Sequence, residues 1–242
     1  MSKKNKNNKR FIIFLIILLS YSHVYSQNGI RDFSVSASYS YTNVGKMFLF
    51  PNSTSVILKE SNVPFHDIFS YAGEVRYKIS ESILIGLRVE FIKKTELGRN
   101  LTDPRFIVDD GFEVIPVELS GYYYLPFSTD DFKFFMGGGF GYYLGKHVRN
   151  FGDARLIKVK QKFAYGIQVL VGADYMITDY FSSRFEMRFR DPEVVVTSRY
   201  SKEIVNYNGQ LYKVDLSDFD TRININGVTF TLGFAFNFDL PF

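Results

Sequence analysis

The last segment of the chain, Gly227–Phe242, alternates between large apolar side chains and small ones. The large side chains all share one parity: Val228, Phe230, Leu232, Phe234, Phe236 and Phe238. A period of two residues is that of a β-strand, so this row occupies one face, and threonine, glycine, alanine and asparagine occupy the other. A row of phenylalanines must be shielded from water, either by packing against other protein side chains or by contact with lipid. The strands of a membrane-spanning barrel turn such a row to lipid and the small polar row to the lumen.

Residues 1–26 have the three parts of a secretory signal peptide. A start with five cations and no acid precedes the apolar run Phe11–Leu19, and the polar stretch Ser20–Ser26 follows it. Val24 and Ser26 fit the −3 and −1 positions of a cleavage site. The apolar run is well short of the roughly 20 residues that a spanning helix needs. We therefore predict a cleaved signal peptide over residues 1–26 and one mature domain over residues 27–242.

The charge and cysteine content exclude several classes of function. Without the five cations of residues 1–26 the formal net charge falls from +4 to −1, so overall charge does not support binding to nucleic acid. The absence of cysteine excludes disulfides, thiolate metal sites and a lipid anchor on an N-terminal cysteine. No pattern in the sequence indicates a cofactor or a metal site.

Seven further stretches repeat the alternation of the last one: residues 33–42, 69–79, 83–91, 115–125, 132–145, 163–175 and 181–190. Long connections alternate with short ones along the chain. The long ones are residues 46–66, 93–111, 146–160 and 191–222, and the short ones are residues 80–82, 126–131 and 177–179. We predict an all-β fold, an eight-stranded antiparallel up-and-down transmembrane β-barrel of the bacterial outer membrane, with both termini in the periplasm. A soluble eight-stranded barrel is the alternative, but its apolar residues would line the interior.

Local signals predict details of the strand pairing. The three-residue turn 80–82 places Ile79 opposite Ile83. On the lumen face, this register sets Glu74 opposite Arg88, and we expect Arg76 to lie diagonal to Glu90.

Two further signals concern single residues. Pro116 lies inside a predicted strand, and its missing donor predicts a bulge or a locally broken ladder. Asn208-Gly209 lies between two β-prone runs, Ile204-Val205 and Leu211-Tyr212, which predicts a small hairpin within the last long connection.

The inward row of the predicted strands carries many charges. The set is Glu74, Arg76, Arg88, Glu90, Glu118, Asp174, Arg184, Glu186, Arg188 and Arg190. An eight-stranded barrel is just wide enough for side chains to fill it, and charges inside are tolerable only when they are paired. We therefore expect an ion-pair plug. A narrow gated conductance through the same groups is the alternative, because neighbouring Arg and Glu rows allow other pairings.

Other candidate sites have a plain structural explanation. His66 and His147 could serve an outer-membrane acyltransferase or deacylase, but no patterned serine accompanies them, and we expect both to be solvated residues of the long connections. The glycine-rich run Gly137–Gly141 lies in a strand and precedes no helix, so we expect it to make room for Tyr122 and Tyr124 rather than to bind phosphate. The catalytic, cofactor and metal sites are therefore predicted to be absent. Three tyrosines of the last long connection either contact a partner or pack within its hairpin: Tyr200, Tyr207 and Tyr212.

The chain from Gln27 to Phe242 resembles the small eight-stranded outer-membrane barrels of the OmpA-like, porin-type β-barrel domain family. The resemblance rests on Ile115-Pro116-Val117 with Tyr122-Tyr123-Tyr124, on the strand from Gly137 to Tyr143, and on the aromatic end at Phe242. It implies that the barrel-assembly machinery reads a terminal insertion signal, which would consist of Phe234, Phe236, Phe238 and Phe242. Asp239 and Pro241 interrupt the usual strand end and could displace that signal. A PorT-like role beside a secretion or gliding apparatus is implied by this resemblance alone.

The functional expectation is a structural or interaction role, in which a monomeric, charge-filled barrel holds four long surface loops. A narrow pore for ions or small solutes is the second hypothesis, and a lipid-modifying enzyme is the third. The expected partners are outer-membrane lipid and lipopolysaccharide, the barrel-assembly machinery during insertion, and a protein at the surface loops. Nucleic acid is not expected.

Overall fold

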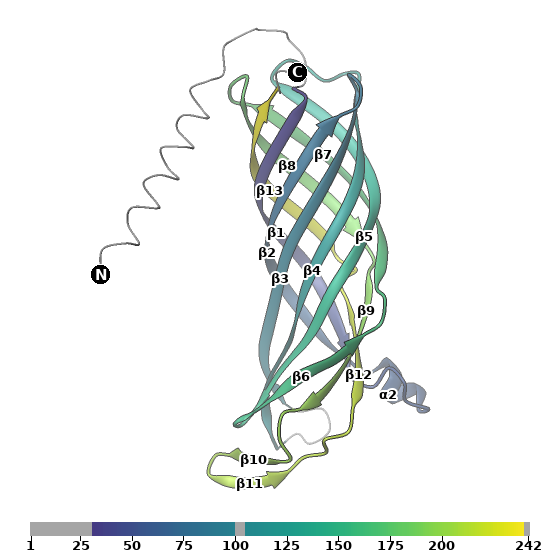
Figure 1. The fold of residues 1–242 in the computed structure, drawn as a ribbon, viewed down its shortest axis with the longest axis vertical. Helices are drawn as coiled ribbons and strands as arrows, with labels where there is room; N and C mark the ends of the chain where they lie inside the picture. Colours follow the sequence, from purple (N-terminus) through teal and green to yellow (C-terminus); the bar gives the residue numbers. More distant parts are fainter. Residues whose placement is uncertain (1–30, 100–104, 240–242) are drawn as a thin grey trace, which may run out of the picture.

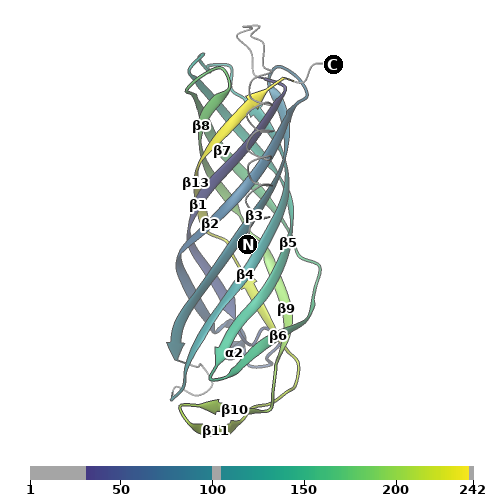
Figure 2. The same ribbon diagram turned by 60° about the vertical axis from the view of Figure 1, so that its left-hand side comes forward.

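The computed structural model describes residues 31–99 and 105–239 of the 242-residue chain. The predicted signal peptide and Phe242 lie outside these residues. The described part is a closed, antiparallel β-barrel, longer than it is wide, with a small hairpin across one end (Figures 1 and 2). The all-β barrel prediction is confirmed.

Five strands run the whole length of the barrel: β1 (Phe33–Phe48), β2 (Asn62–Lys78), β3 (Ile83–Arg99), β4 (Ile107–Tyr124) and β5 (Phe132–Phe151). Three further positions are each occupied by two shorter strands in succession: β6 (Ala154–Gln161) with β7 (Tyr165–Met176), β8 (Phe181–Arg190) with β9 (Glu193–Tyr200), and β12 (Phe219–Asn224) with β13 (Val228–Phe238). The remaining elements are the helix α2 (Val56–Glu60) and the hairpin strands β10 (Ile204–Tyr207) and β11 (Gln210–Lys213). Among the described residues, no helix has the length and apolar character needed to cross a membrane.

The strand order forms two stacked rings of eight strands that share β1 to β5. The first ring is closed by β7, β8 and β13, and the second by β6, β9 and β12. The first ring includes the short connections and the two ends of the described chain, and we call this the turn end. The second ring carries α2 and the β10–β11 hairpin, and we call this the loop end (Figure 1).

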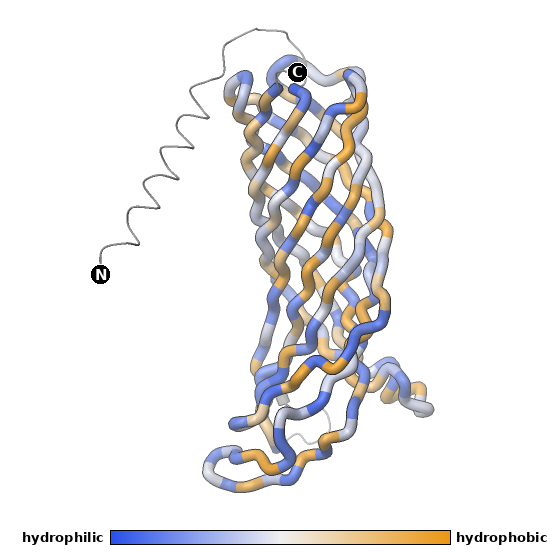
Figure 3. Tube along the Cα trace, viewed as in Figure 1, coloured by the Kyte–Doolittle hydropathy of each residue, from blue (hydrophilic) through white to orange (hydrophobic). Residues whose placement is uncertain are grey.

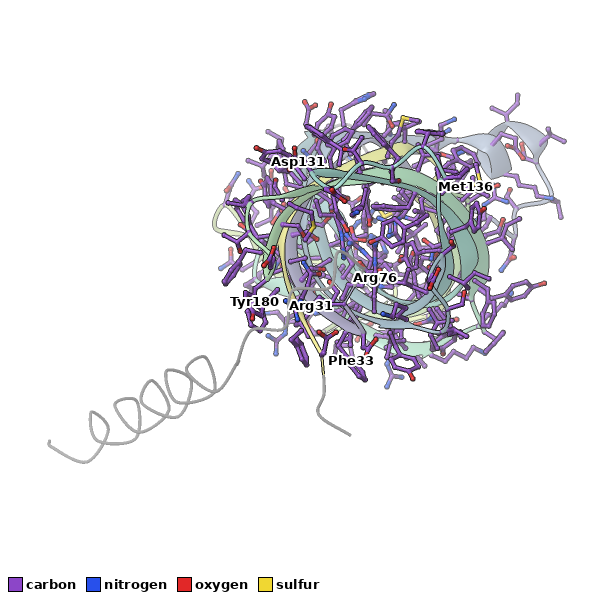
Figure 4. The ribbon with its side chains drawn as sticks, turned by 90° about the horizontal axis from the view of Figure 1, so that it is seen from above. Arg31, Phe33, Arg76, Asp131, Met136 and Tyr180 are labelled. Atoms are coloured by element: carbon purple, nitrogen blue, oxygen red, sulfur yellow. The ribbon has the colours of Figure 1, made fainter. Side chains whose placement is uncertain are left out.

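The outer surface of the turn-end ring is apolar. Its strands alternate in hydropathy from residue to residue, with the large apolar side chains outside, as Met136 and Phe33 show, and Arg76 inside (Figures 3 and 4). On β3 the apolar outward row runs from Ile83 to Phe91, close to the 9–11 residues of a membrane-spanning strand. The next outward position, Lys93, pairs with Glu113 at 3.0 Å. The lipid band therefore surrounds the turn-end ring and ends at this ion pair.

The loop-end ring has the opposite polarity. Its inward side chains form an apolar cluster in which the fully buried members include Met47, Phe65, Ile68, Phe112 and Val194. Its outward positions carry charges, among them Lys46, Lys93, Glu113 and Lys146. This half of the barrel is built like a soluble one, since water replaces lipid on its outside.

The predicted boundaries of the long connections are wrong at this end. Much of residues 46–66, 93–111, 146–160 and 191–222 forms strands rather than loops. The prediction followed an outward apolar row, and that row stops where the lipid band stops. Beyond it the strands continue with their apolar residues inside.

The register predictions are mostly confirmed. Ile79 and Ile83 are joined by a backbone hydrogen bond of 2.9 Å, and Glu74 lies opposite Arg88. The expected diagonal contact of Arg76 with Glu90 is wrong, because this register places Ala72 opposite Glu90 and Gly86 opposite Arg76.

Two single-residue signals also have their expected effects. The β3–β4 ladder omits the pairs that would involve Ile115 and Pro116, while the register on both sides is unchanged. The ladder is thus locally broken at the proline, as predicted. Asn208 and Gly209 both have positive φ, 52° and 83°, and form the two-residue turn between β10 and β11.

The two ends of the described chain are joined at the turn end. The strand β13 ends at Phe238, and the Asp239 carboxylate accepts hydrogen bonds from Arg31 Nη1 at 2.5 Å and from the Asp32 backbone N–H at 2.9 Å. Asp239 therefore interrupts the strand, as its sequence position suggested, and also ties β13 to the start of β1.

Gly139 on β5 is required by the close approach of β4. An added Cβ would lie 2.0 Å from the Leu119 carbonyl oxygen, a backbone atom that cannot move aside without separating the two strands. We expect Gly139→Ala to abolish most of the folded form after refolding in detergent, measured as loss of the heat-dependent gel shift. Gly121→Ala is the control, because a Cβ there has no neighbouring heavy atom within 4 Å. Equal losses in both variants would contradict this explanation.

Candidate functional site

The lumen of the turn-end ring holds all ten charges that the sequence analysis selected. They form one continuous chain in which acid and arginine alternate: Asp174, Arg184, Glu74, Arg76, Glu186, Arg188, Glu118, Arg190, Glu90 and Arg88. Successive members lie within ion-pair distance. The closest pair is Arg76–Glu186, and the other pairs range from 2.6 Å for Arg188–Glu118 to 3.7 Å for Arg88–Glu90. The chain contains as many acids as arginines, so it carries no net formal charge.

The strand pairing explains why these residues meet. The inward positions of β8 carry Arg184, Glu186, Arg188 and Arg190 at every second residue, and β2, β3, β4 and β7 supply the remaining members. Side chains from opposite walls reach each other across the narrow lumen, as in the Arg76–Glu186 pair. All ten side chains are almost fully buried. Buried charges need both a counterion and hydrogen bonds, and the sequence places both around them.

Hydroxyl groups supply the additional hydrogen bonds. Ser70 donates to Glu90 at 2.6 Å, Tyr124 donates to Asp174 at 3.0 Å, and Tyr143 donates to Glu118 at 3.0 Å. Tyr122 donates to Glu74. Each carboxylate in these bonds therefore has a neutral donor as well as an arginine, which holds its position in the lumen.

Arg76 has a second type of contact. Its guanidinium lies over the Tyr122 ring at 3.7 Å from the centroid and over the Phe135 ring at 4.7 Å. Two of its nitrogen atoms, Nε and Nη1, have no hydrogen-bond partner. The aromatic faces are therefore the electrostatic partners of this side of Arg76.

The glycines of β5 give these aromatic rings their space. Gly137 lies next to Tyr122, because an added Cβ at Gly137 would lie 3.1 Å from the Tyr122 ring. Gly141 has the Glu118 and Tyr143 side chains as its neighbours in the same way. The predicted role is confirmed for Tyr122 at Gly137, whereas the tyrosine beside Gly141 is Tyr143 rather than Tyr124. The backbone of these residues belongs to the strand.

A second polar group lies in the loop-end ring, beyond the apolar cluster. The Asp110 carboxylate contacts His147 Nε2 at 2.7 Å and accepts a hydrogen bond from Arg149 at 2.5 Å, while His147 Nδ1 lies 2.9 Å from the Thr221 hydroxyl. The expectation that His147 is a solvated loop residue is wrong. The strand β5 extends past the lipid band, and there its even-numbered side chains point outward while His147 points into the barrel. His66, in contrast, is exposed on β2.

A hydroxyl, an imidazole and a carboxylate in line are also the groups of an acyl-transfer site. Here, however, His147 is 1% exposed and Thr221 is 0% exposed. A substrate has no access to either group in this arrangement, and the cluster acts as a buried hydrogen-bonded layer. The sequence could have indicated the continued strand, since Val108, Phe112 and Val114 share the inward parity and Asp109 and Glu113 the outward one, but Asp110 breaks this pattern.

The three tyrosines of the loop end pack among themselves and their neighbours. Tyr207 stacks on Phe151 at 5.2 Å, and its hydroxyl oxygen accepts a hydrogen bond from the Ile107 backbone N–H at 3.1 Å. Tyr212 meets Phe106 edge-on at 4.9 Å, and Tyr200 lies 6.2 Å from Phe219. These contacts fasten the hairpin to the rest of the loop end.

The residues of the predicted insertion signal line the outside of β13. Phe234 faces lipid, whereas Phe236 and Phe238 are half-buried against neighbouring rings. The Phe236 ring is tilted against Phe181 at 5.1 Å, and the Phe238 ring stacks on Phe33 at 5.7 Å. Phe242 lies outside the described residues.

Comparison with known proteins shows a shared fold. No family model and no curated protein sequence matches the chain. Among solved structures, the outer membrane protein OprG from Pseudomonas aeruginosa is similar over 89% of this chain and 100% of its own, with a TM-score of 0.61 and 12% identity. Neisserial surface protein A covers 85% of this chain and 97% of its own, with a TM-score of 0.49 and 14% identity. The similarity to OprG shows that the chain has the fold of the small outer-membrane β-barrels.

Glu186 is the acceptor for both Arg76 and Arg188 in the middle of the charge chain. We expect Glu186→Ala to lower the free energy of unfolding by about 3–5 kcal/mol, because two buried arginines lose a counterion. Urea unfolding of the refolded protein in vesicles, followed by tyrosine fluorescence, measures this change. The lipid-facing neighbour Met187 provides the control, and Met187→Ala should cost far less. A similar loss in both variants would mean that the charge chain adds no special stability.

Proposed function

We propose that this chain is a monomeric bacterial outer-membrane barrel with a closed lumen and a structural or interaction role at the cell surface. The observation that carries this proposal is the pair of stacked seals inside the barrel, the charge chain in the turn-end ring and the apolar cluster in the loop-end ring. The long connections of such barrels lie outside the cell. The loop end is therefore extracellular in this proposal, and both termini are periplasmic.

The two seals oppose solute passage for different reasons. An ion entering the charge chain would have to separate buried ion pairs that have no solvent to replace the lost partner. An ion entering the apolar cluster would lose its hydration without gaining a polar partner. A solute crossing the barrel would have to overcome both free-energy costs in succession. The interior is therefore better suited to a membrane anchor than to a pore.

Conductance measurements test the closed lumen. We expect the refolded protein to give no stable current steps in a planar bilayer, and Glu74→Ala to remain silent because the apolar cluster is unchanged. Val75→Ala, at the lipid-facing neighbour, serves as the control. Reproducible current steps whose amplitude changes in Glu74→Ala or Arg184→Ala would contradict the closed lumen and support a narrow gated pore.

The loop end offers apolar side chains outside the lipid band. Ile57 on α2 is 83% exposed, and Leu211 on the hairpin is 72% exposed. Large exposed apolar groups that face neither lipid nor the protein core are typical of interaction surfaces. We propose a protein partner at this end, with outer-membrane lipid and lipopolysaccharide around the barrel and the barrel-assembly machinery acting on β13 during insertion. Nucleic acid is not a partner in this proposal.

Membership of the OmpA-like family, or a PorT-like place beside a secretion or gliding apparatus, remains an inference from the sequence motifs. The proposed role does not depend on it. The lipid-enzyme hypothesis gains no support from the geometry, because the hydroxyl and imidazole of Thr221 and His147 are sealed inside the barrel.

Purification from native membranes in mild detergent tests the interaction role. We expect a stoichiometric partner to accompany the wild-type chain and to be lost when Val56, Ile57 and Leu58 are all replaced by serine, since these side chains are the exposed apolar surface of α2. Leu97→Ser is the control, because Leu97 is equally exposed but belongs to β3. If the α2 variant retained the partner, the partner would bind a surface other than α2. If the wild-type chain purified without any partner, the interaction role would be rejected and only a structural role would remain.

A further inference from the structure

A cavity of about 560 Å³ lies at the loop end, between the segment 49–53 that follows β1 and the strands β6, β9 and β12. The strands β6, β9 and β12 belong to the ring beyond the outward ion pair that ends the lipid band, and they lie on the same end as α2 and the hairpin (Figure 1). Binding sites for small molecules fall in the range of about 300–1,000 Å³. The cavity has the size of such a site and is separate from the charge chain in the lumen.

One carboxylate of this cavity is held rigidly. Asp220 accepts a hydrogen bond from the Thr197 hydroxyl at 2.5 Å and another from the Asn52 side-chain amide at 2.8 Å, and Lys162 Nζ lies 3.7 Å away. The hydrogen bond from Thr197 lowers the pKa of the Asp220 carboxyl. These contacts join the segment 49–53 to β9 and β12, so the walls of the cavity are preorganised before any ligand arrives.

The charges around the cavity cancel. Lys160 and Asp218 line it together with Asp220, and Lys162 is the cation beside Asp220. Lys162 lies outside the lining and is the counterion of Asp220, which leaves one cation, Lys160, and one acid, Asp218, so neither a polyanion nor a polycation is attracted. Among the described residues, no group of three or more His, Cys, Asp or Glu side chains is arranged to hold a metal ion.

The polar groups include both donors and acceptors, since ammonium groups only donate, carboxylates only accept, and the hydroxyl and amide do both. The other lining residues are Ser53, whose hydroxyl also donates and accepts, and the apolar residues Leu49, Phe50, Pro51 and Phe219. A ligand that fits this lining has many groups able both to donate and to accept, no net charge, and an apolar face. Sugars have these properties, because their hydroxyl groups surround a ring whose C–H faces are apolar.

We propose that the cavity between residues 49–53 and the strands β6, β9 and β12 binds a neutral mono- or disaccharide unit at the cell surface. The Asp218 carboxylate and the Lys160 ammonium are the groups left to bind the sugar hydroxyls, whereas Asp220 positions the wall. This binding goes beyond the anchoring role and is independent of whether the lumen conducts.

Calorimetric titration of the refolded full chain tests this assignment. Maltose, lactose, cellobiose and chitobiose are the probes, and the detergent must have no sugar head group, because a glycoside detergent would compete. We expect saturable binding of at least one disaccharide, and a loss of about tenfold in affinity in Asp218→Ala and in Lys160→Ala, as for a lost hydrogen bond to a charged group. Both side chains are exposed, so both variants should fold.

Lys213→Ala is the matched control, because Lys213 is an exposed cation of the same end that pairs with Glu203 outside this cavity. Its affinity should equal that of the wild type, and the heat-dependent gel shift should show that every variant is folded. Absence of saturable binding for all four disaccharides would overturn the saccharide site. The site would also be rejected if the affinity were unchanged in both Asp218→Ala and Lys160→Ala, or if Lys213→Ala lowered it as much as they do. Tighter binding of a sulfated heparin disaccharide would replace the neutral ligand by an anionic one.

Discussion

The alternating chain of ten charges in the lumen is the interaction on which the lipid-embedded ring depends. A strand in this ring must turn one face to lipid, so its polar residues have no place except the interior. Because the interior of an eight-stranded barrel is too narrow for bulk water, those residues must satisfy one another. The sequence meets this demand by placing three Arg and one Glu on the inward row of β8 and by supplying acids, arginines and hydroxyl groups from the strands around it.

Beyond the lipid band the same strands follow the opposite rule. The outward row changes from apolar side chains to ion pairs such as Lys93–Glu113, and the lumen changes at that level from ion pairs to an apolar cluster. One continuous barrel thus has two halves. The half inside the membrane has a polar interior and an apolar outer surface, and the half outside it has an apolar interior and a polar outer surface. The breaks between β6 and β7, β8 and β9, and β12 and β13 lie near this change, where three of the eight strand positions are interrupted.

These two halves have consequences for function. In the proposed function, the seals formed by charges and by apolar side chains make the barrel an anchor, and the loop end forms a firm platform beyond the lipid. Its parts are fastened to one another by specific contacts, such as those of Tyr207 with Phe151 and of Asp220 with Thr197 and Asn52. A rigid surface of this kind fits the proposed interaction role, because little conformational entropy is lost on binding.

The sequence by itself determined the eight-stranded barrel, the side of each strand that faces lipid, the Glu74–Arg88 register and all ten lumen charges, because each of these follows from a period of two residues and from short turns. It did not reveal the extent of the strands past the lipid band, where the outward apolar row that marked each strand is absent. The pairing of Arg76 with Glu186 across the lumen, the buried position of His147 and the cavity at Asp220 were decided only by the tertiary structure. Each of them joins residues far apart in the chain, and closure of the barrel alone fixes which walls face each other.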